Sequence, residues 1–167
     1  RLELVVQLQS SFVLIDQKTG YVKALVGGRG EKTSSMSYNR ATAAARQPGS
    51  TFKILSTYAP ALDVFGDTLA STKVDKVYTG YGGHQVNNVD MYRSNAPTTF
   101  RSAIEQSKNT VATWVMDEDV TPEYAYNFLT ERFGFTTLVP SDQVISLAIG
   151  GITNGVTNLE LTNAFAA

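Results

Sequence analysis

The sequence predicts an α+β fold, and three observations support that prediction. Residues 11–16 and 21–27 are two short runs of β-branched and other apolar side chains, which is the composition of strands. A tight polar connection joins the two runs, as in an antiparallel hairpin. From residue 50 onward, apolar side chains recur mainly at helical spacing. A few strands followed by helices are typical of an α+β domain.

The connection between the two predicted strands reads Lys18-Thr19-Gly20. Asp16 before it and Gly20 at its end are common turn residues, because Asp bonds to the backbone that follows it and Gly accepts a positive φ. We therefore expect a hairpin turn at residues 18–20. Two strands alone do not form a stable sheet in water. The hairpin should thus pair with further strands from a partner or present an edge prone to aggregation.

The first long helix is predicted over about 50–65. Pro48 and Gly49 form a turn signal directly before an apolar run at helical spacing. Pro60 should kink this helix or tighten its end, and Gly66 should terminate it. The side chains that recur on its buried face are Phe52, Leu55, Tyr58, Ala59 and Leu62.

Two polar stretches flank this helix. Residues 28–47 are rich in Gly and Ser, so we expect a loop with one short helix at 41–45. Residues 66–97 contain many Gly, Asn and Asp residues and should be mainly irregular. His84, the only histidine, follows a Gly-rich run in this second stretch and is expected to be an ordinary surface residue.

The helices predicted after residue 97 begin at recognisable capping residues. Thr121 and Pro122 supply a cap and a first-turn proline, and Gly134 closes the same helix. Thr157 and Glu160 form a capping box near the end of the chain. The predicted helices run from 98 or 99 to 106, from about 109, from 122 to 133, and from about 158.

Ser50 and Lys53 lie three residues apart at the predicted start of the first long helix. Residues i and i+3 share a helix face, so the hydroxyl and the amine could come within hydrogen-bonding distance. A serine becomes a useful nucleophile when a neighbouring base removes its proton, and a desolvated lysine can act as that base. The helix start would also stabilise negative charge on an attacked carbonyl. The alternative is that Ser50 only caps the helix and Lys53 is a solvated side chain.

Composition excludes several other functions. Fourteen basic and fifteen acidic residues among 167 give a net charge of −1, which argues against a nucleic-acid binder with a basic patch. The absence of cysteine excludes disulfides, thiolate metal sites and a cysteine nucleophile. One histidine cannot form a histidine-rich metal site, so we expect neither a metal nor a cofactor. The acidic run 117–119 should be a solvated connection, because its spacing does not suit calcium.

Several ordered segments resemble the transpeptidase domain of class A penicillin-binding proteins. Residues 39–42 and 46–53 are similar to the family's active-site serine segment, and residues 14–28 resemble its first strand hairpin. Residues 99–110 are similar to the segment that carries the second motif, S-x-N, and residues 150–167 resemble a later helix entry. These segments occur in the family's order, which is far more specific than any one of them.

The resemblance covers residues 11–167 and implies the fold shared by penicillin-binding proteins and serine β-lactamases. The family's third motif, K-T-G, follows the other two, so Lys18-Thr19-Gly20 is a hairpin turn that only spells it. Ser37-Tyr38-Asn39 likewise spells S-x-N too early in the chain. We therefore interpret residues 1–167 as a partial transpeptidase domain, with a strand hairpin and a helical part, that ends before the later sheet strands and the catalytic K-T-G.

The resemblance implies a role for each motif residue. Ser50 would attack the terminal D-Ala-D-Ala bond of a peptidoglycan stem peptide, and Lys53 would be its base. Ser107 would carry a proton to the leaving nitrogen, and Asn109 would bind the substrate's amide backbone. Lys108 is the variable middle position and should point away. β-Lactam antibiotics would acylate the same serine.

The expected partners are stem peptides, β-lactams and the remaining C-terminal part of the domain, with no nucleic acid. The expected location is the extracytoplasmic face of a bacterial membrane, although no apolar run here approaches the roughly 18 residues of a membrane helix. A serine β-lactamase shares the first two motifs, but it needs a base for a deacylating water, and no segment after Asn109 resembles one. A non-catalytic β-lactam sensor and an inactive structural fragment remain alternatives.

Overall fold

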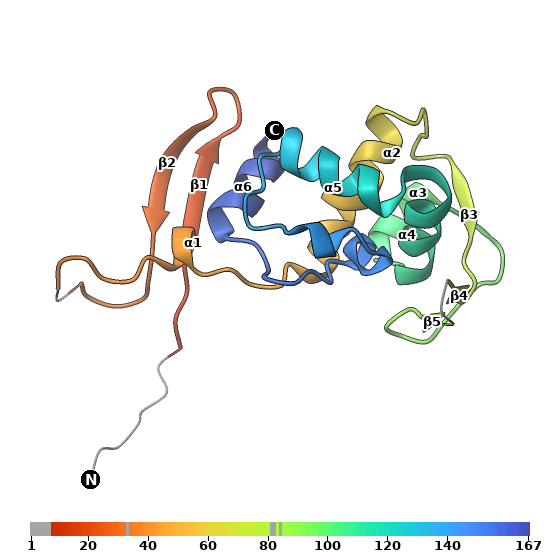
Figure 1. Ribbon diagram of the computed structural model, residues 1–167, viewed down its shortest axis with the longest axis horizontal. Helices are drawn as coiled ribbons and strands as arrows, with labels where there is room; N and C mark the ends of the chain where they lie inside the picture. Colours follow the sequence, from red (N-terminus) through yellow and green to blue (C-terminus); the bar gives the residue numbers. More distant parts are fainter. Residues whose placement is uncertain (1–7, 33, 81–82, 84) are drawn as a thin grey trace, which may run out of the picture. The chain divides into compact units, whose positions relative to one another are not determined.

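The computed structural model describes residues 8–32, 34–80, 83 and 85–167. They form two compact units (Figure 1). The hairpin unit comprises the described part of Arg1–Arg46 together with Val156–Ala167, and the helical unit comprises Gln47–Gly155. Strands and helices are both present, which agrees with the predicted α+β class. His84, predicted to be a surface residue, lies outside the described residues.

The hairpin unit contains the two predicted strands, β1 (Phe12–Asp16) and β2 (Tyr21–Val26), paired antiparallel. The backbone N–H groups of Thr19 and Gly20 donate to the Asp16 carbonyl at 3.2 and 2.8 Å. The Lys18 N–H donates to Asp16 Oδ1 at 3.0 Å. Gly20 has a φ of +71°, which the turn requires and glycine accepts without strain. Residues 18–20 are therefore the predicted hairpin turn.

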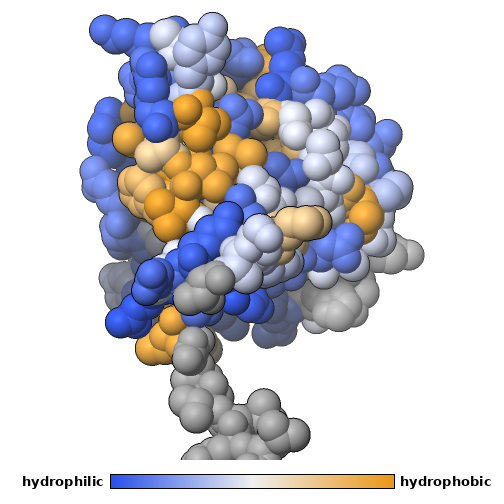
Figure 2. All heavy atoms as spheres, turned by 90° about the vertical axis from the view of Figure 1, so that its left-hand side faces the viewer, coloured by the Kyte–Doolittle hydropathy of each residue, from blue (hydrophilic) through white to orange (hydrophobic). Residues whose placement is uncertain are grey.

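The hairpin carries apolar side chains on both faces, and Val13 is its buried residue. Phe12 pairs with Val26 on one face, and Val13 pairs with Leu25 on the other. Val13 is buried and β1 packs beside α6 (Asn158–Ala166), whereas Phe12, Leu14 and Val26 are about half exposed. Figure 2 shows hydrophobic side chains gathered on the surface that faces the viewer.

Two short helices complete the hairpin unit. The helix predicted at 41–45 occurs as α1 (Arg40–Ala43), which Asn39 caps by accepting the Ala41 N–H at 3.0 Å. It starts one residue early and ends two residues early. The predicted capping box begins α6, because the Thr157 hydroxyl accepts the Glu160 N–H and the Glu160 carboxylate accepts the Thr157 N–H.

The predicted first long helix is helical from residue 49 to 63, but it is not a regular α-helix. It begins as a 3₁₀ turn, η1 (Gly49–Thr51), passes through a π turn, η2 (Ile54–Tyr58), and ends as α2 (Ala59–Asp63). The π turn lies just before Pro60, which has no N–H to complete an α-helical ladder. Gly66, with a φ of +76°, follows the helix end as predicted.

Residues 66–97 were predicted to be mainly irregular, and this prediction missed two short pairings. Strand β3 (Thr72–Val74) pairs with β6 (Pro97–Thr99), and β4 (Tyr78–Thr79) pairs with β5 (Gln85–Val86). These strands contain two or three residues, too few to show an alternating apolar pattern along the sequence.

The remaining helices follow the predicted order. Helices α3 (Phe100–Glu105), α4 (Asn109–Val115) and α5 (Pro122–Glu131) occur where expected. The acidic run 117–119 was predicted to be a solvated connection, and Asp117 and Glu118 are exposed as expected, but the run is helical and partly ion-paired. It lies in a π turn, η4 (Met116–Val120), in which Glu118 and Asp119 pair with Lys73 at 2.7 and 2.8 Å. Two 3₁₀ turns follow, η5 (Pro140–Asp142) and η6 (Ile145–Ile149).

The core of the helical unit holds the serine segment in place. Phe52, between Ser50 and Lys53, is fully buried and packs edge-on against Phe135, with ring centroids 5.4 Å apart. Other large side chains that are almost fully buried are Tyr58, Phe100, Met116, Leu129 and Leu147. Within the described part of the chain, no helix is both long enough and apolar enough to cross a membrane.

Candidate active site

Ser50 lies in the first helical turn of the helical unit, with its side chain exposed. The predicted alternative role as a helix cap does not hold, because the capping position is Pro48 and no side chain makes a capping bond there. Thr51 stabilises the same turn by donating from Oγ1 to the Pro48 carbonyl at 2.7 Å. With Phe52 anchored in the core, the turn presents Ser50 at the surface.

Lys53 is not the solvated side chain of the alternative interpretation, because it is only 2% exposed. Its Nζ donates to Ser50 Oγ at 3.1 Å, which is the i, i+3 contact that the sequence predicted. It also donates to the Ser107 carbonyl at 2.7 Å and to Ser107 Oγ at 2.9 Å. Burial disfavours the charged amine and lowers the pKa of Lys53 to about 8.

Ser107 reaches Lys53 from the turn between α3 and α4. Its N–H donates to the Ile104 carbonyl at 3.0 Å, and the Lys108 N–H donates to the Ala103 carbonyl at 2.8 Å. This is the bond pattern of a Schellman motif, in which the residue after the helix adopts a left-handed conformation. Ser107 occupies that position with a φ of +52°, where glycine is usual. The surrounding structure must therefore stabilise a mildly strained backbone at this residue.

Asn109 is the first residue of α4, and its side chain is partly buried. Its Nδ2 donates to the Asn87 carbonyl at 3.0 Å, so the side-chain amide is held by the preceding loop. Lys108 points away from Ser50 and Lys53 as predicted, but it does so into a buried polar cluster around Asp75.

The segment around Gly150 supports the serine turn from the other side. The Ile152 N–H donates to Gln47 Oε1 at 3.1 Å, and Gln47 Nε2 donates back to the Ile152 carbonyl. Gly150, with a φ of +79°, lies so close to Gly49 that a Cβ at residue 150 would collide with the Gly49 carbonyl. The sequence marked residues 150–167 only as a resemblance, and no local signal connected Gly150 with the turn that carries Ser50.

The arrangement has the parts of an activated nucleophile. An exposed hydroxyl lies within hydrogen-bonding distance of a buried amine, and that amine is oriented by a third group, Ser107. A lysine with a pKa of about 8 has a substantial neutral fraction near neutral pH, and a neutral amine can accept a proton. Across the described residues, no group of three or more His, Cys, Asp or Glu side chains could hold a metal ion.

The chain has the fold of penicillin-binding protein transpeptidase domains. It is similar to the crystal structure of penicillin-binding protein 1A from Haemophilus influenzae, with a TM-score of 0.78 and 30% identity over 95% of this chain and 23% of that chain. It also has the fold of PonA1 from Mycobacterium tuberculosis in complex with penicillin V, with a TM-score of 0.75 and 20% identity over 95% of this chain and 43% of that chain.

The sequence places the chain in one family. Residues 10–167 match the family described as the penicillin binding protein transpeptidase domain, and the chain belongs to it. Penicillin-binding protein 1A of Clostridium perfringens is 38% identical over 96% of this chain and 24% of its own length. Penicillin-binding protein 1F of Bacillus subtilis is 38% identical over 94% of this chain and 21% of its own length. The predicted family and fold class are thus confirmed, and the chain spans about a quarter or less of these two relatives.

Proposed function

We propose that this chain forms part of a serine D,D-transpeptidase domain that crosslinks peptidoglycan stem peptides at D-Ala-D-Ala. The observation that supports this most directly is the position of Lys53 Nζ, which bridges Ser50 Oγ and Ser107 Oγ at 3.1 and 2.9 Å. Ser50 is the nucleophile, Lys53 is its base, and Ser107 carries a proton between Lys53 and the leaving group.

The first step forms an ester. Ser50 Oγ attacks the carbonyl carbon of the penultimate D-alanine while the neutral amine of Lys53 takes the hydroxyl proton. The C–N bond then breaks, Ser107 Oγ passes the proton to the departing nitrogen, and D-alanine leaves. In the second step the amine of a neighbouring stem peptide attacks the ester carbon, a new amide forms, and Ser50 recovers its proton through Lys53.

The start of the helix stabilises the oxyanion. The first N–H groups of a helix have no intrahelical acceptor, so the Ser50 N–H in turn η1 can donate to the carbonyl oxygen as it becomes negative. The second donor and the grip on the substrate carboxylate come from the K-T-G strand, which the resemblance places after the other two motifs.

Asn109 binds the substrate backbone. Its Nδ2 is occupied by the Asn87 carbonyl at 3.0 Å, which fixes the plane of the amide. The Oδ1 of the same side chain is then oriented to accept an N–H from the stem peptide.

The complete domain consists of this chain together with the later strands and the third motif that the resemblance implies. Those strands pair with the β1–β2 hairpin and close the substrate-binding side of the site. The complete domain acts on the extracytoplasmic face of a bacterial membrane, in a membrane-anchored parent protein. β-Lactams acylate Ser50 because their ring carbonyl takes the place of the D-Ala-D-Ala carbonyl.

Intact mass spectrometry after incubation with benzylpenicillin tests this proposal. The complete domain should gain the mass of one benzylpenicillin, and Ser50→Ala should gain none. Ser37→Ala, which alters the S-x-N sequence that precedes the serine segment, should be acylated like the wild type. The 18.1 kDa chain alone should gain none, since it lacks the third motif.

Three results would contradict the proposal. An adduct on Ser50→Ala would exclude Ser50 as the nucleophile. Rapid turnover of a chromogenic cephalosporin by the complete domain would identify a β-lactamase instead. Acylation without any crosslinking of stem peptides would identify a β-lactam sensor.

A further inference from the structure

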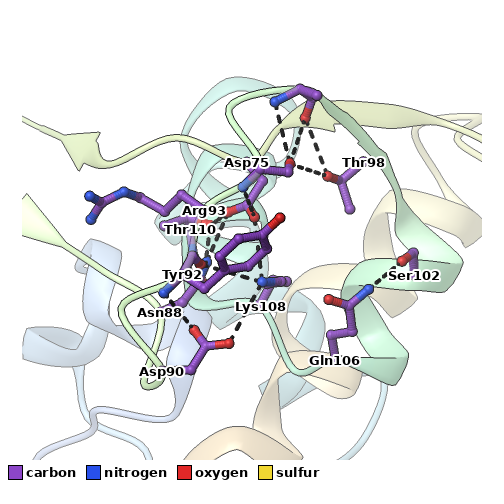
Figure 3. Close-up of polar contacts among 12 residues, drawn as sticks. Asp75, Asn88, Asp90, Tyr92, Arg93, Thr98, Ser102, Gln106, Lys108 and Thr110 are labelled. Carbon is purple, nitrogen blue, oxygen red and sulfur yellow. Dashed lines mark hydrogen bonds and ion pairs between the residues drawn. The ribbon is translucent and has the colours of Figure 1, made fainter.

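Lys108, between the two motif residues Ser107 and Asn109, is a buried cation-forming side chain. It is only 4% exposed, and its Nζ lies 3.5 Å from Asp75 Oδ2. The same Nζ lies 4.9 Å from the centre of the Tyr92 ring and donates to the Tyr92 carbonyl at 3.4 Å. Figure 3 shows the Lys108 side chain lying beside Tyr92, with Asp75 across from it. Lysine is rarely buried unless it is paired, so this position calls for a specific reason.

Asp75 is the centre of the cluster, and its side chain has no exposed surface. It accepts from Thr110 Oγ1 at 2.5 Å, from Asn88 Nδ2 at 2.9 Å and from the Ser94 N–H at 3.1 Å. Burial alone would raise the pKa of Asp75, but the hydrogen bonds from Thr110, Ser94 and Asn88 and the charge of Lys108 lower it below its usual value. Asp75 is therefore a carboxylate at neutral pH.

Asn88 extends the same network to the first turn of α4. Its Oδ1 accepts from the Thr110 N–H at 3.2 Å and from Thr110 Oγ1 at 3.1 Å, while its Nδ2 also donates to the Tyr92 carbonyl at 2.8 Å. Asn109 is bonded to the carbonyl of the preceding residue, Asn87. The loop that carries Asn87, Asn88 and Tyr92 thus makes hydrogen bonds to the three residues that follow Ser107. Of these three residues, Lys108 is the one next to Ser107.

The consequence concerns Ser107 itself. Its left-handed backbone is mildly strained, yet both its carbonyl and its hydroxyl contact Lys53 Nζ. A strained residue keeps its conformation only when neighbouring contacts hold it there. Lys108 directly follows it, and the buried pairing with Asp75 limits how far that neighbour can move.

We propose that Asp75 and Lys108 are positioning residues for the acylation reaction. They hold the backbone after Ser107 so that the Ser107 carbonyl and hydroxyl stay in contact with Lys53. Neither residue touches the substrate in this role, and both act through Ser107. This inference rests on the proposed function of Ser50 and Lys53, and it assigns a role to the middle position of the S-x-N motif in this chain.

Removing both charges separates positioning from stability. Lys108→Met in the complete domain leaves a buried carboxylate without its cation, so it should lower both the melting temperature and the acylation rate. The double variant Asp75→Asn with Lys108→Met contains no unpaired buried charge, so its melting temperature should lie above that of Lys108→Met, although the Ser94 N–H loses its carboxylate acceptor. Its acylation by benzylpenicillin should stay roughly tenfold to a hundredfold slower, because Ser107 is no longer held in register.

Two further readouts distinguish positioning from a purely structural role. In the double variant, the pH midpoint of acylation should move upward from about 8. When Ser107 no longer packs against Lys53, water reaches the amine and the pKa of Lys53 rises. Lys108→Arg keeps the positive charge and should retain most of the acylation rate. Lys73→Met is the matched control, since it also removes a lysine paired with carboxylates and does not contact the motif. Benzylpenicillin should acylate this control variant at the wild-type rate.

A double variant that acylates as fast as the wild type, with an unchanged pH midpoint, would overturn the positioning role. A Lys73→Met variant as slow as the double variant would also overturn it, because the loss would then be general. If the wild-type domain were not acylated at Ser50, the proposed function would fail and this inference with it. Because the wild type and Ser50→Ala are measured first, the two failures are distinguishable.

Discussion

Lys53 is a cation-forming side chain in a position where a cation is poorly solvated. It contacts three oxygens of Ser50 and Ser107, and none of the ion pairs found among the described residues involves it. Between a pH of about 8 and the ordinary lysine pKa of 10.5, the folded protein therefore binds fewer protons at this site than the unfolded chain. Burying Lys53 thus costs stability below about pH 8, and the cost decreases as the pH rises towards 10.5.

The same pKa sets the expected pH dependence of acylation. Only the neutral amine can take the Ser50 proton, so the acylation rate of the complete domain should rise with pH, with a midpoint of about 8. Between pH 7 and pH 9 the neutral fraction, and with it the rate, should increase about tenfold. Rapid-quench mass spectrometry with benzylpenicillin at a series of pH values measures this directly.

Lys53→Arg is the control for that experiment, because a guanidinium group keeps its proton at every accessible pH. This variant should be slow throughout and show no rise. A wild-type rate that is flat between pH 6 and pH 10, or a variant that shows the same rise, would remove Lys53 from the role of base.

At the scale of the elements, the serine turn η1 is held by the segment that follows η6. Gly150 adopts a φ of +79° directly against Gly49, and Gln47 exchanges hydrogen bonds with Ile152. Glycine is needed at residue 150 because a Cβ there would collide with the Gly49 carbonyl, whereas Gly49 has open space around its Cβ position and a positive φ of +57°. The position of Ser50 thus depends on residues about one hundred positions later in the chain.

Gly150→Ala should therefore affect catalysis as well as stability. A positive φ on a residue other than glycine costs about 1–3 kcal/mol, and the collision with the Gly49 carbonyl adds to it. Gly134→Ala is the matched control, since Gly134 has a φ of +72° and open space around its Cβ position. Both variants should have a lower free energy of unfolding in urea. Only Gly150→Ala should also be acylated more slowly by benzylpenicillin, per folded molecule. Equal acylation rates for the two variants would show that the contact with Gly49 does not position Ser50.

At the scale of the whole molecule, the β1–β2 hairpin is a sheet of two strands with an exposed apolar face. One of its faces packs within the hairpin unit, while Phe12 and Leu14 on the other face are 54% and 49% exposed. Exposed apolar side chains on a two-stranded sheet favour association with other strands. This is why we propose that the later strands and their covering elements complete the fold around this hairpin.

Leu14→Lys should have opposite effects on the chain alone and on the complete domain. In the chain alone it should reduce self-association, because it places a charge on the exposed apolar face. In the complete domain it should lower the free energy of unfolding by about 1–3 kcal/mol, because the side chain is then buried. Light scattering and urea unfolding measure the two effects. Val89→Lys, at an exposed loop position of the helical unit, should change neither. A complete domain that tolerates Leu14→Lys without loss would show that this face stays uncovered.

Local sequence signals predicted the features that depend on a few neighbouring residues. The turn at residues 18–20 follows from Asp16 and Gly20, and the pairing of Ser50 with Lys53 follows from helical spacing alone. The irregular parts were harder to predict. Pro60 predicted an irregularity in the first long helix but not that it would be a π turn. The short β3–β6 and β4–β5 pairings depend on packing against other elements, so no local pattern marks them.

The sequence by itself determined the α+β class, the hairpin turn and the Ser50–Lys53 face, because turn chemistry and helical periodicity act over a few residues. It indicated the family through the resemblance of several ordered segments. Only the tertiary structure decided that Ser107, 54 residues away, contacts Lys53, and that Lys108 pairs with Asp75. Those contacts arise because α4 packs against the helical segment 49–63, which carries Ser50 and Lys53. Their free energy comes from burial shared by distant segments, which no stretch of sequence carries alone.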